Sequence, residues 1–246
     1  MTEDRAKLLP FYLVIDVSYS MDGENLKAAN DIMPELADAI ARNPILSDKV
    51  RFSLVDFSDD ARVQLPMCDL LDPNVVLPGL TVRGATSYAA AFRTLRHQIE
   101  QDVLQLKGDN FSVHRPAVFF VSDGSPSDAD HEWRSAFLEL TGYDKPTGTG
   151  FAMYPNVIPF GVDQADPKIL QALIHPSSGS KPMRMFLMDQ GCRPADAIRS
   201  MAEIMISSVL NSGMGVANGA SGVVLPDDDQ LPAGVSAYTV DDEDFL

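Results

Sequence analysis

The sequence predicts a protein of the α/β class, in which a doubly wound, mostly parallel sheet of six strands has one antiparallel edge strand and helices on both faces. Apolar runs of strand length alternate with segments of helical periodicity nearly throughout the chain, which is the pattern of a covered parallel sheet. One pair of runs, 50–57 and 62–67, is separated by too few residues for a helical crossover. This pair predicts an antiparallel hairpin at the sheet edge.

Six segments have the composition of buried strands, because they are short, apolar and rich in β-branched or aromatic residues. The first contains Asp16 near its end, and the last is a methionine-rich run late in the chain. The predicted strands are Phe11–Val17, Val50–Phe57, Arg62–Met67, Pro116–Ser122, Asn156–Gly161 and Met183–Met188.

Five segments between these runs predict helices. The clearest one, 25–43, has a single apolar stripe at helical spacing, with Pro34 inside it. Ser87 is a suitable N-cap for the second helix, and Pro167 and Pro194 suit the first turns of the fourth and fifth. The predicted helices are Asn25–Asn43, Tyr88–Lys107, Asp130–Leu140, Pro167–Ile174 and Pro194–Leu210.

The composition changes abruptly after Leu210. Residues 211–246 are rich in Gly, Ala, Pro, Ser and Asp and contain no Lys or Arg, so we interpret them as a flexible acidic tail. The chain then divides into an N-terminal extension at 1–7, one folded domain at 8–210 and the tail at 211–246.

The charge of the chain restricts its partners. With 35 acidic and 19 basic residues it has a formal net charge of −16, which argues against binding to nucleic acid and against attraction to anionic lipid. Its two cysteines, Cys68 and Cys192, belong to no CxxC or Cys/His grouping, as expected in a reducing compartment. Because neither a secretory signal pattern nor an apolar run of membrane-spanning length occurs, we expect a cytoplasmic protein without a membrane partner. We also expect the protein on its own to be a monomer.

Oxygen-bearing side chains follow the first predicted strand. Asp16, Ser18 and Ser20 lie at its carboxyl end, which is the edge where open α/β sheets bind ligands. A carboxylate and two hydroxyls are hard donors that suit Mg²⁺, Mn²⁺ or Ca²⁺ and not a soft metal. The same residue types are also common in turns and helix caps, so this motif alone leaves both interpretations open.

Two further segments strengthen the metal interpretation. Thr86 lies on a loop just before the 88–107 helix, and Gly84 allows the backbone of this loop to approach other groups closely. Asp123 follows the apolar run 116–122, so it occupies a strand end equivalent to that of Asp16. The three segments together predict one site of two carboxylates and three hydroxyls.

This combination resembles the von Willebrand factor A (vWA) fold with its metal-ion-dependent adhesion site (MIDAS). The family pattern is Asp-x-Ser-x-Ser, then a Thr in a Gly-rich loop, then Asp-Gly after a later strand. It matches Asp16, Ser18, Ser20, Thr86 and Asp123. The resemblance covers about residues 8–210 and implies a Rossmann-like sheet and a metal-dependent protein-binding function.

Within that family the chain is most similar to the small cytoplasmic bacterial vWA proteins of the tellurium-resistance type, called TerY-like. The similarity rests on 9–16, on 122–128 and on Trp133. It implies a stand-alone module that acts as a metal-dependent scaffold in a stress response, in a system that also contains a protein kinase and a protein phosphatase.

These residue types suit a site that holds a cation without completing its coordination. Three hydroxyls and two carboxylates offer up to five oxygen ligands to Mg²⁺, which prefers six. The resemblance implies direct ligation by Ser18, Ser20 and Thr86, with Asp16 and Asp123 acting partly through bound waters. An Asp or Glu of a partner protein can then take the remaining position.

Four residues near this site are candidates for contacting the partner protein: Tyr19, Ser87, Ser125 and Trp133. Two of them have clear alternative roles. Ser87 is a suitable helix cap, and Trp133, the single tryptophan, belongs to a residue type that usually packs against other side chains.

Binding is favoured over catalysis. A phosphate hydrolase that begins with an Asp at a strand end usually needs a second carboxylate in the same loop, but here Ser18 and Ser20 occupy the next positions. The sequence contains no GxxxxGK, GxGxxG or GxSxG motif. We weigh three functions: a metal-dependent protein-binding module, a metal-dependent phosphate hydrolase, and a structural module whose metal only holds loops together.

Overall fold

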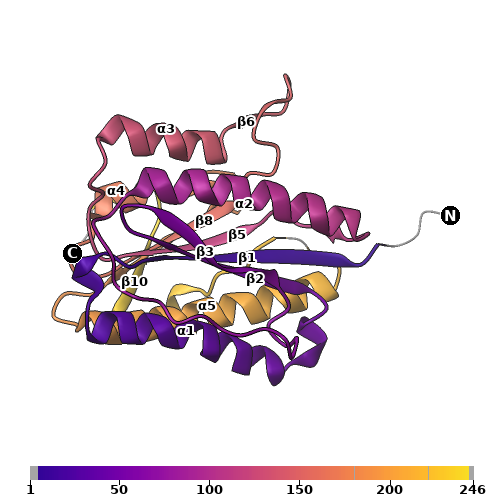
Figure 1. Cartoon of the computed structure of the whole chain (residues 1–246), viewed down its shortest axis with the longest axis horizontal. Helices are drawn as coiled ribbons and strands as arrows, with labels where there is room; N and C mark the ends of the chain where they lie inside the picture. Colours follow the sequence, from indigo (N-terminus) through magenta and orange to yellow (C-terminus); the bar gives the residue numbers. More distant parts are fainter. Residues whose placement is uncertain (1–4, 180, 221, 244–246) are drawn as a thin grey trace.

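A central sheet organises the computed structural model, which describes residues 5–179, 181–220 and 222–243 (Figure 1). In the described residues this sheet has eight strands, of which seven lie in the order β10-β9-β8-β5-β1-β2-β3, while β4 pairs with β1. The strands are β1 Lys7–Asp16, β2 Val50–Phe57, β3 Ala61–Cys68, β4 Ser112–Val113, β5 Ala117–Ser122, β8 Asn156–Gly161, β9 Met185–Met188 and β10 Val235–Tyr238.

The middle of the sheet is parallel and both of its edges are antiparallel. β1 pairs in parallel with β2 and with β5, and the parallel order continues through β8 to β9. β3 pairs antiparallel with β2 at one edge, and β10 pairs antiparallel with β9 at the other. The carboxyl ends of β1, β5, β8 and β9 therefore all lie along one side of the sheet.

Helices cover both faces of the sheet. In Figure 1, α2 and α3 lie above it and pack against each other, while α1 and α5 form a second pair below it. A small hairpin of β6 Tyr143–Asp144 and β7 Thr149–Gly150 extends beyond α3. The helices are α1 Glu24–Ala41, α2 Tyr88–Gly108, α3 Asp130–Thr141, α4 Pro167–Gln171 and α5 Pro194–Ala217, with 3₁₀ turns η1 Tyr19–Met21, η2 Pro44–Leu46 and η3 Asp228–Gln230.

β1 is central because it is apolar on both faces, and nine of its ten residues are buried. Its Phe11 ring stacks between Phe52 of β2 and Phe119 of β5, with centroid distances of 5.6 and 5.7 Å. The Tyr12 hydroxyl donates to Asp102 Oδ2 of α2 at 2.8 Å. These contacts fix β1 against both neighbouring strands and one helix, so the residues that follow β1 start from a rigid position.

The predicted α/β class and the mostly parallel sheet are confirmed. The six predicted strands appear as β1, β2, β3, β5, β8 and β9, and the five predicted helices appear as α1 to α5. The predicted strand count and the single antiparallel edge are wrong, because the sheet also includes β4 and β10. β4 has two residues and β10 has four, so neither has the long apolar run on which strand prediction depends.

The prediction of a flexible tail from residue 211 is wrong for α5 and β10. Helix α5 continues to Ala217 through glycines that are poor helix formers. One of them, Gly213, is buried where an added Cβ would lie 3.0 Å from Leu46 Cδ2, so a small residue permits close contact with η2. Further on, β10 supplies the hydrogen-bond partners that the edge of β9 needs. Both effects depend on tertiary contacts, which local composition does not reveal.

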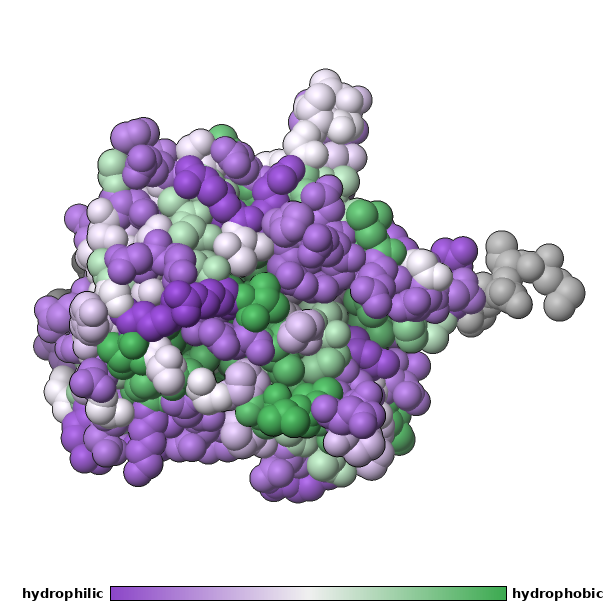
Figure 2. Space-filling view, viewed as in Figure 1, coloured by the Kyte–Doolittle hydropathy of each residue, from purple (hydrophilic) through white to green (hydrophobic). Residues whose placement is uncertain are grey.

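The surface is mostly hydrophilic on the face that Figure 2 shows. Hydrophobic residues appear there in separate patches between hydrophilic ones. Across the described residues, the helices are too short or too polar for any of them to cross a membrane.

Two valines near the C-terminus distinguish a packed strand from a flexible tail. Val235 in β10 is 4% exposed, whereas Val240 just beyond the strand is 41% exposed. We expect Val235→Asp to lower the free energy of unfolding by about 3 kcal/mol, because it buries an unpaired carboxylate. The matched control Val240→Asp should change it by less than about 1 kcal/mol. Equal effects of the two substitutions in urea denaturation would contradict the placement of β10.

Candidate metal centre

The pairing of β1 with β5 brings two of the predicted site carboxylates together. Ile15 pairs with Val121 in parallel register, so Asp16, at the end of β1, lies beside Asp123, which follows β5. Both aspartates are 0% exposed. The chain leaves β1 through Ser18 and turns at once into η1, which places the serine hydroxyls over the same sheet edge.

A chain of hydrogen bonds links these two carboxylates through the backbone N–H of Ser18 and the hydroxyls of Ser18 and Ser20. The Ser18 backbone N–H donates to Asp16 Oδ1 at 2.9 Å, and the Ser18 and Ser20 hydroxyl oxygens are 3.0 Å apart. The Ser20 hydroxyl then donates to Asp123 Oδ1 at 2.9 Å, and the Ser122 hydroxyl donates to Asp16 Oδ2 at 2.8 Å. Four of the five predicted site residues therefore form one connected group.

The fifth residue, Thr86, lies on the loop that enters α2 and is 8% exposed. Its backbone carbonyl accepts hydrogen bonds from the backbone N–H and the hydroxyl of Ser127, at 2.7 and 2.8 Å. The same loop contacts the segment after β1, because the Tyr19 N–H donates to the Gly84 carbonyl at 3.1 Å. The loop is thus tied to both segments that carry the site carboxylates.

The two carboxylates lie in an environment that disfavours their negative charge. The pKa of Asp123 is raised to about 6, first by burial and then by the neighbouring Asp16 carboxylate. Burial also raises the pKa of Asp16, although hydrogen bonds from Ser18 and Ser122 favour its ionised form. Within the described part of the chain, neither aspartate forms an ion pair with a basic side chain.

These residues fit a divalent cation with oxygen ligands. Asp123 Oδ2 is buried and has no hydrogen-bond partner among the described residues, which is unusual for a buried carboxylate oxygen. No group of three or more His, Cys, Asp or Glu side chains able to hold a metal occurs in the described ranges. A cation at this edge must therefore draw part of its coordination from hydroxyl oxygens, which are the ligands that Ser18, Ser20 and Thr86 offer.

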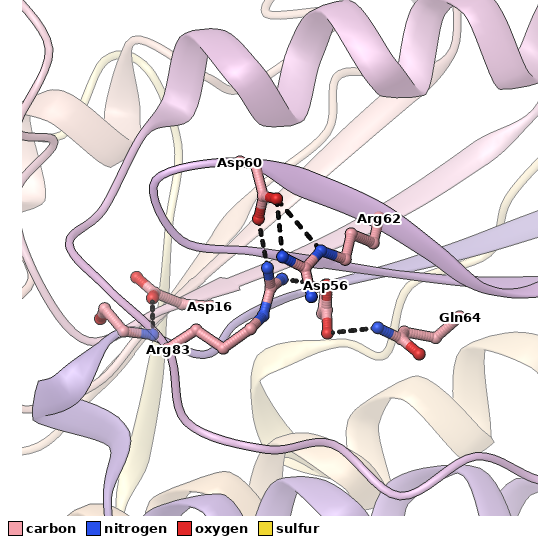
Figure 3. Close-up of polar contacts among 7 residues, drawn as sticks. Asp16, Asp56, Asp60, Arg62, Gln64 and Arg83 are labelled. Carbon is pink, nitrogen blue, oxygen red and sulfur yellow. Dashed lines mark hydrogen bonds and ion pairs between the residues drawn. The ribbon is translucent and has the colours of Figure 1, made fainter.

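An ion-pair network anchors the Thr86 loop to the β2–β3 hairpin (Figure 3). The Arg83 guanidinium pairs with Asp56 at the end of β2 and with Asp60 in the hairpin turn. Gln64 donates to Asp56 Oδ2 at 2.8 Å, and Arg62 donates to Asp60 Oδ2 at 2.8 and 3.1 Å. Burial raises the pKa of Asp56, whereas Arg83 favours its ionised form. Arg83 therefore compensates a carboxylate whose side chain is 1% exposed.

The hairpin turn also holds the backbone of the loop directly. The Ala85 N–H donates to Asp59 Oδ1 at 3.0 Å, and the Ser87 N–H donates to the Ser58 carbonyl at 2.7 Å. Directly before Ala85, Gly84 has a φ of +32°, and an added Cβ would lie 1.8 Å from Asp59 Oδ2. The glycine is therefore required by both the backbone conformation and the close approach of Asp59.

Two of the candidate partner-contact residues face solvent beside the site. Tyr19 is 73% exposed directly after Ser18, and Ser125 is exposed on the loop that follows Asp123. Both positions are accessible to a partner that approaches the carboxyl edge of the sheet.

The other two candidates are used within the fold. The Ser87 hydroxyl caps α2 by accepting from the Ala90 N–H at 3.1 Å, and it donates to Asp128 Oδ1 at 2.8 Å. The prediction that Trp133 contacts a partner is wrong, because its side chain is 1% exposed and its indole N–H donates to Asp130 Oδ1 at 3.1 Å. Trp133 packs edge-on against Tyr88 in the interior.

Sequence reasoning missed the residues that support the predicted ligands. Ser122 hydrogen-bonds Asp16, but in the sequence it is only the last residue of an apolar run. Asp56 and Arg83 are far apart along the chain, so no local pattern indicates their pairing. The one sequence signal for these residues is the hydroxyl of Ser122 directly before the strand-end Asp123, which could have indicated Ser122 as a supporting residue.

A comparison with family models finds a match in the N-terminal half of the chain. Residues 11–125 match the model of the von Willebrand factor type A domain. This range, just under half of the chain, is therefore similar to a vWA domain. All five predicted metal-site residues lie inside the matched range, and the vWA domain is typically a metal-dependent protein-binding module. A comparison with curated proteins finds no match.

Several solved structures are similar to this chain in fold at low sequence identity. One is proximal thread matrix protein 1 from the mussel byssus with a zinc-occupied MIDAS motif, at 14% identity and a TM-score of 0.52, covering 82% of this chain and 48% of that one. Another is the pilus adhesin SpaC from Lactobacillus rhamnosus GG, at 14% identity and a TM-score of 0.56, covering 83% and 30%. The chain spans less than half the length of either, and these similarities support the fold alone.

The ion pairs of Arg83 allow a prediction about the free energy of unfolding. Arg83→Met leaves the buried Asp56 carboxylate without its cation, so we expect the free energy of unfolding to fall by about 3 kcal/mol. Arg62→Met removes an exposed partner of Asp60 and should cost less than about 1 kcal/mol. Urea denaturation of both variants measures the difference, and similar values for the two would show that Arg83 does not anchor the loop.

Proposed function

We propose that Asp16, Ser18, Ser20, Thr86 and Asp123 hold a divalent cation, through which the protein binds an acidic side chain of a partner protein. The observation that carries this proposal is the unpartnered, buried Oδ2 of Asp123 beside a second buried carboxylate without an ion-pair partner in the described chain. Two such carboxylates are costly unless a cation neutralises them.

The chemistry of the residues supports a division of roles. Ser18, Ser20 and Thr86 supply neutral oxygens for direct ligation, while Asp16 and Asp123 supply negative charge and act partly through bound waters. When bound, the cation supplies a Lewis-acidic centre that attracts a carboxylate. We choose Mg²⁺ as the ion, and Mn²⁺ and Ca²⁺ share its preference for oxygen ligands.

The surroundings of the site support capture of a protein partner. Tyr19 and Ser125 are exposed at the same sheet edge and offer an aromatic surface and a hydroxyl beside the proposed cation. The net negative charge of the chain repels anionic partners. A cation at this edge would reverse the local charge and attract an Asp or Glu side chain. Specificity for that acidic residue then depends on the metal.

The wider context of the protein remains a prediction from its similarity to TerY-like proteins. On that basis we propose a cytoplasmic, bacterial, monomeric module in a stress-response or tellurium-resistance system linked to phosphorylation. A kinase or phosphatase of the same system is then the partner that presents the acidic residue. Residues 9–16 and 122–128 carry this assignment.

Two alternatives give different chemistry at the same site. In a metal-dependent phosphate hydrolase, a metal-bound water would need a nearby general base, but among the described residues no histidine is hydrogen-bonded to Ser18 or Ser20. In a structural module, the cation would hold the three loops together without an exchangeable position. The loops are already joined by protein hydrogen bonds, which favours the binding module over the structural one.

The metal proposal predicts the effect of removing one ligand oxygen. Thr86→Val keeps the size of the side chain and removes its hydroxyl, so we expect Mn²⁺ and Mg²⁺ to bind about tenfold more weakly in isothermal titration calorimetry. The matched control Thr81→Val, at an exposed position on the same connecting loop, should bind as the unmodified protein does. Equal affinities of the two variants would contradict Thr86 as a ligand.

Removal of the metal with EDTA and the variant Asp16→Ala distinguish the binding module, the structural module and the hydrolase. For the binding module, EDTA abolishes capture of a partner from cell extract, as does Asp16→Ala, while the thermal unfolding temperature of the chain in EDTA stays within a few degrees. A large loss of stability in EDTA supports the structural module. Sustained hydrolysis of p-nitrophenyl phosphate that Asp16→Ala abolishes supports the hydrolase.

A further inference from the structure

A pocket of about 530 Å³ lies at the sheet edge opposite the candidate metal centre. Arg115 lines it just before β5, Asn156 lines it as the first residue of β8, and Met183 lines it just before β9. The pocket therefore lies where the parallel strands begin, whereas Asp16 and Asp123 lie where they end. The β6–β7 hairpin contributes Lys145 to its wall.

The lining of the pocket is basic in a strongly acidic protein. Arg115, Lys145 and Lys181 all line it, and no Asp or Glu among the described residues does. In the described part of the chain, none of the three forms an ion pair, although the whole sequence has 35 acidic residues. Three uncompensated cations around one hollow attract an anion, because their fields add and no carboxylate competes.

The arginine of this group is held in place by an aromatic residue. The Arg115 guanidinium carbon lies 4.1 Å from the centroid of the Tyr154 ring, and its Nη2 donates to the Tyr154 hydroxyl at 2.5 Å. Arginine has five N–H donors in a planar fork, so this contact orients the group and leaves other donors for a ligand. Tyr154 itself also lines the pocket.

One buried polar atom in the pocket lining has no hydrogen-bond partner among the described residues. Asn156 is 6% exposed and lies in the same lining. His114 also lines the pocket, and its Nε2 is buried without a hydrogen-bond partner in the same part of the chain. Buried polar groups are nearly always hydrogen-bonded, so the His114 Nε2 is available to a polar ligand, and Asn156 is a further polar residue in the same lining.

We propose that this pocket binds a small phosphorylated molecule, whose phosphate lies among Arg115, Lys145 and Lys181 and accepts a hydrogen bond from the Asn156 amide. A phosphate monoester carries close to two negative charges and three strong acceptor oxygens, which matches three cations and an amide donor better than a single carboxylate does. The volume suits a ligand of mononucleotide size or smaller.

The net charge of the chain favours a small ligand over a macromolecular one. At −16 the protein as a whole repels a polyanion such as RNA, whose many phosphates extend beyond the pocket. A small phosphorylated molecule places its charge only where the three basic residues converge. This inference is independent of the metal centre, since the two sites lie at opposite ends of the parallel strands.

Calorimetric titration of the full chain in EDTA tests the proposal with three probes: inorganic phosphate, pyrophosphate and adenosine 5′-monophosphate. We expect at least one probe to bind at a single saturable site. The double variant Lys145→Ala/Lys181→Ala should bind it about tenfold or more weakly, because two charge-assisted contacts are lost. The matched control Lys27→Ala/Lys168→Ala removes the same charge at exposed positions elsewhere and should retain the affinity.

A third variant tests the base of the pocket. Asn156→Asp keeps the side-chain shape and adds a negative charge, so a correctly folded variant should lose binding of the probe. Its unfolding temperature reports the fold, and if it does not fold, the lysine variants carry the test. The proposal is overturned if no probe binds at concentrations up to about 10 mM. It is equally overturned if the pocket and control lysine pairs lose affinity to the same extent.

Discussion

The buried pair of carboxylates at the ends of β1 and β5 is the constraint on which this site depends. Asp16 ends β1 and Asp123 directly follows β5, so the parallel pairing of these strands brings the two carboxylates close together, and both are shielded from solvent. Such a pair is unfavourable in isolation, and hydrogen bonds from Ser18, Ser20 and Ser122 offset only part of its cost. Part of the negative charge stays uncompensated, above all at Asp123 Oδ2, which has no hydrogen-bond partner among the described residues. A bound cation would compensate it.

The rest of the fold supplies the rigidity that this arrangement needs. The aromatic stacking of Phe11 with Phe52 and Phe119 fixes β1 between its neighbours, and the parallel register then determines where its carboxyl end lies. The Thr86 loop is not part of the sheet, so Arg83 and the β2–β3 hairpin hold it instead. The edge where the parallel strands begin is basic, because Arg115, Lys145 and Lys181 surround a pocket there.

Local sequence patterns predict the central strands and the residues at their carboxyl ends. The continuous apolar runs identified the central strands, and hard oxygen donors at two strand ends identified the residues that meet at the carboxyl edge. The patterns failed where tertiary contacts decide. β10 forms on the edge of β9 from a segment of weak strand character, α5 continues through glycines that permit close contact, and Trp133 is buried by Tyr88. The pairing of Arg83 with Asp56 likewise could not be predicted from local sequence, because it joins segments that are distant along the chain.

The most direct test of the account is a crystal structure grown with Mn²⁺, with anomalous differences measured to locate the ion. We predict one strong peak at the carboxyl edge of the sheet, within ligand distance of the hydroxyl oxygens of Ser18, Ser20 and Thr86 and next to Asp16 and Asp123. At least one of its coordination positions should be filled by water or by a carboxylate from another molecule. The absence of a peak at this edge under saturating Mn²⁺, or a Mn²⁺ ion bound only elsewhere, would contradict the central claim.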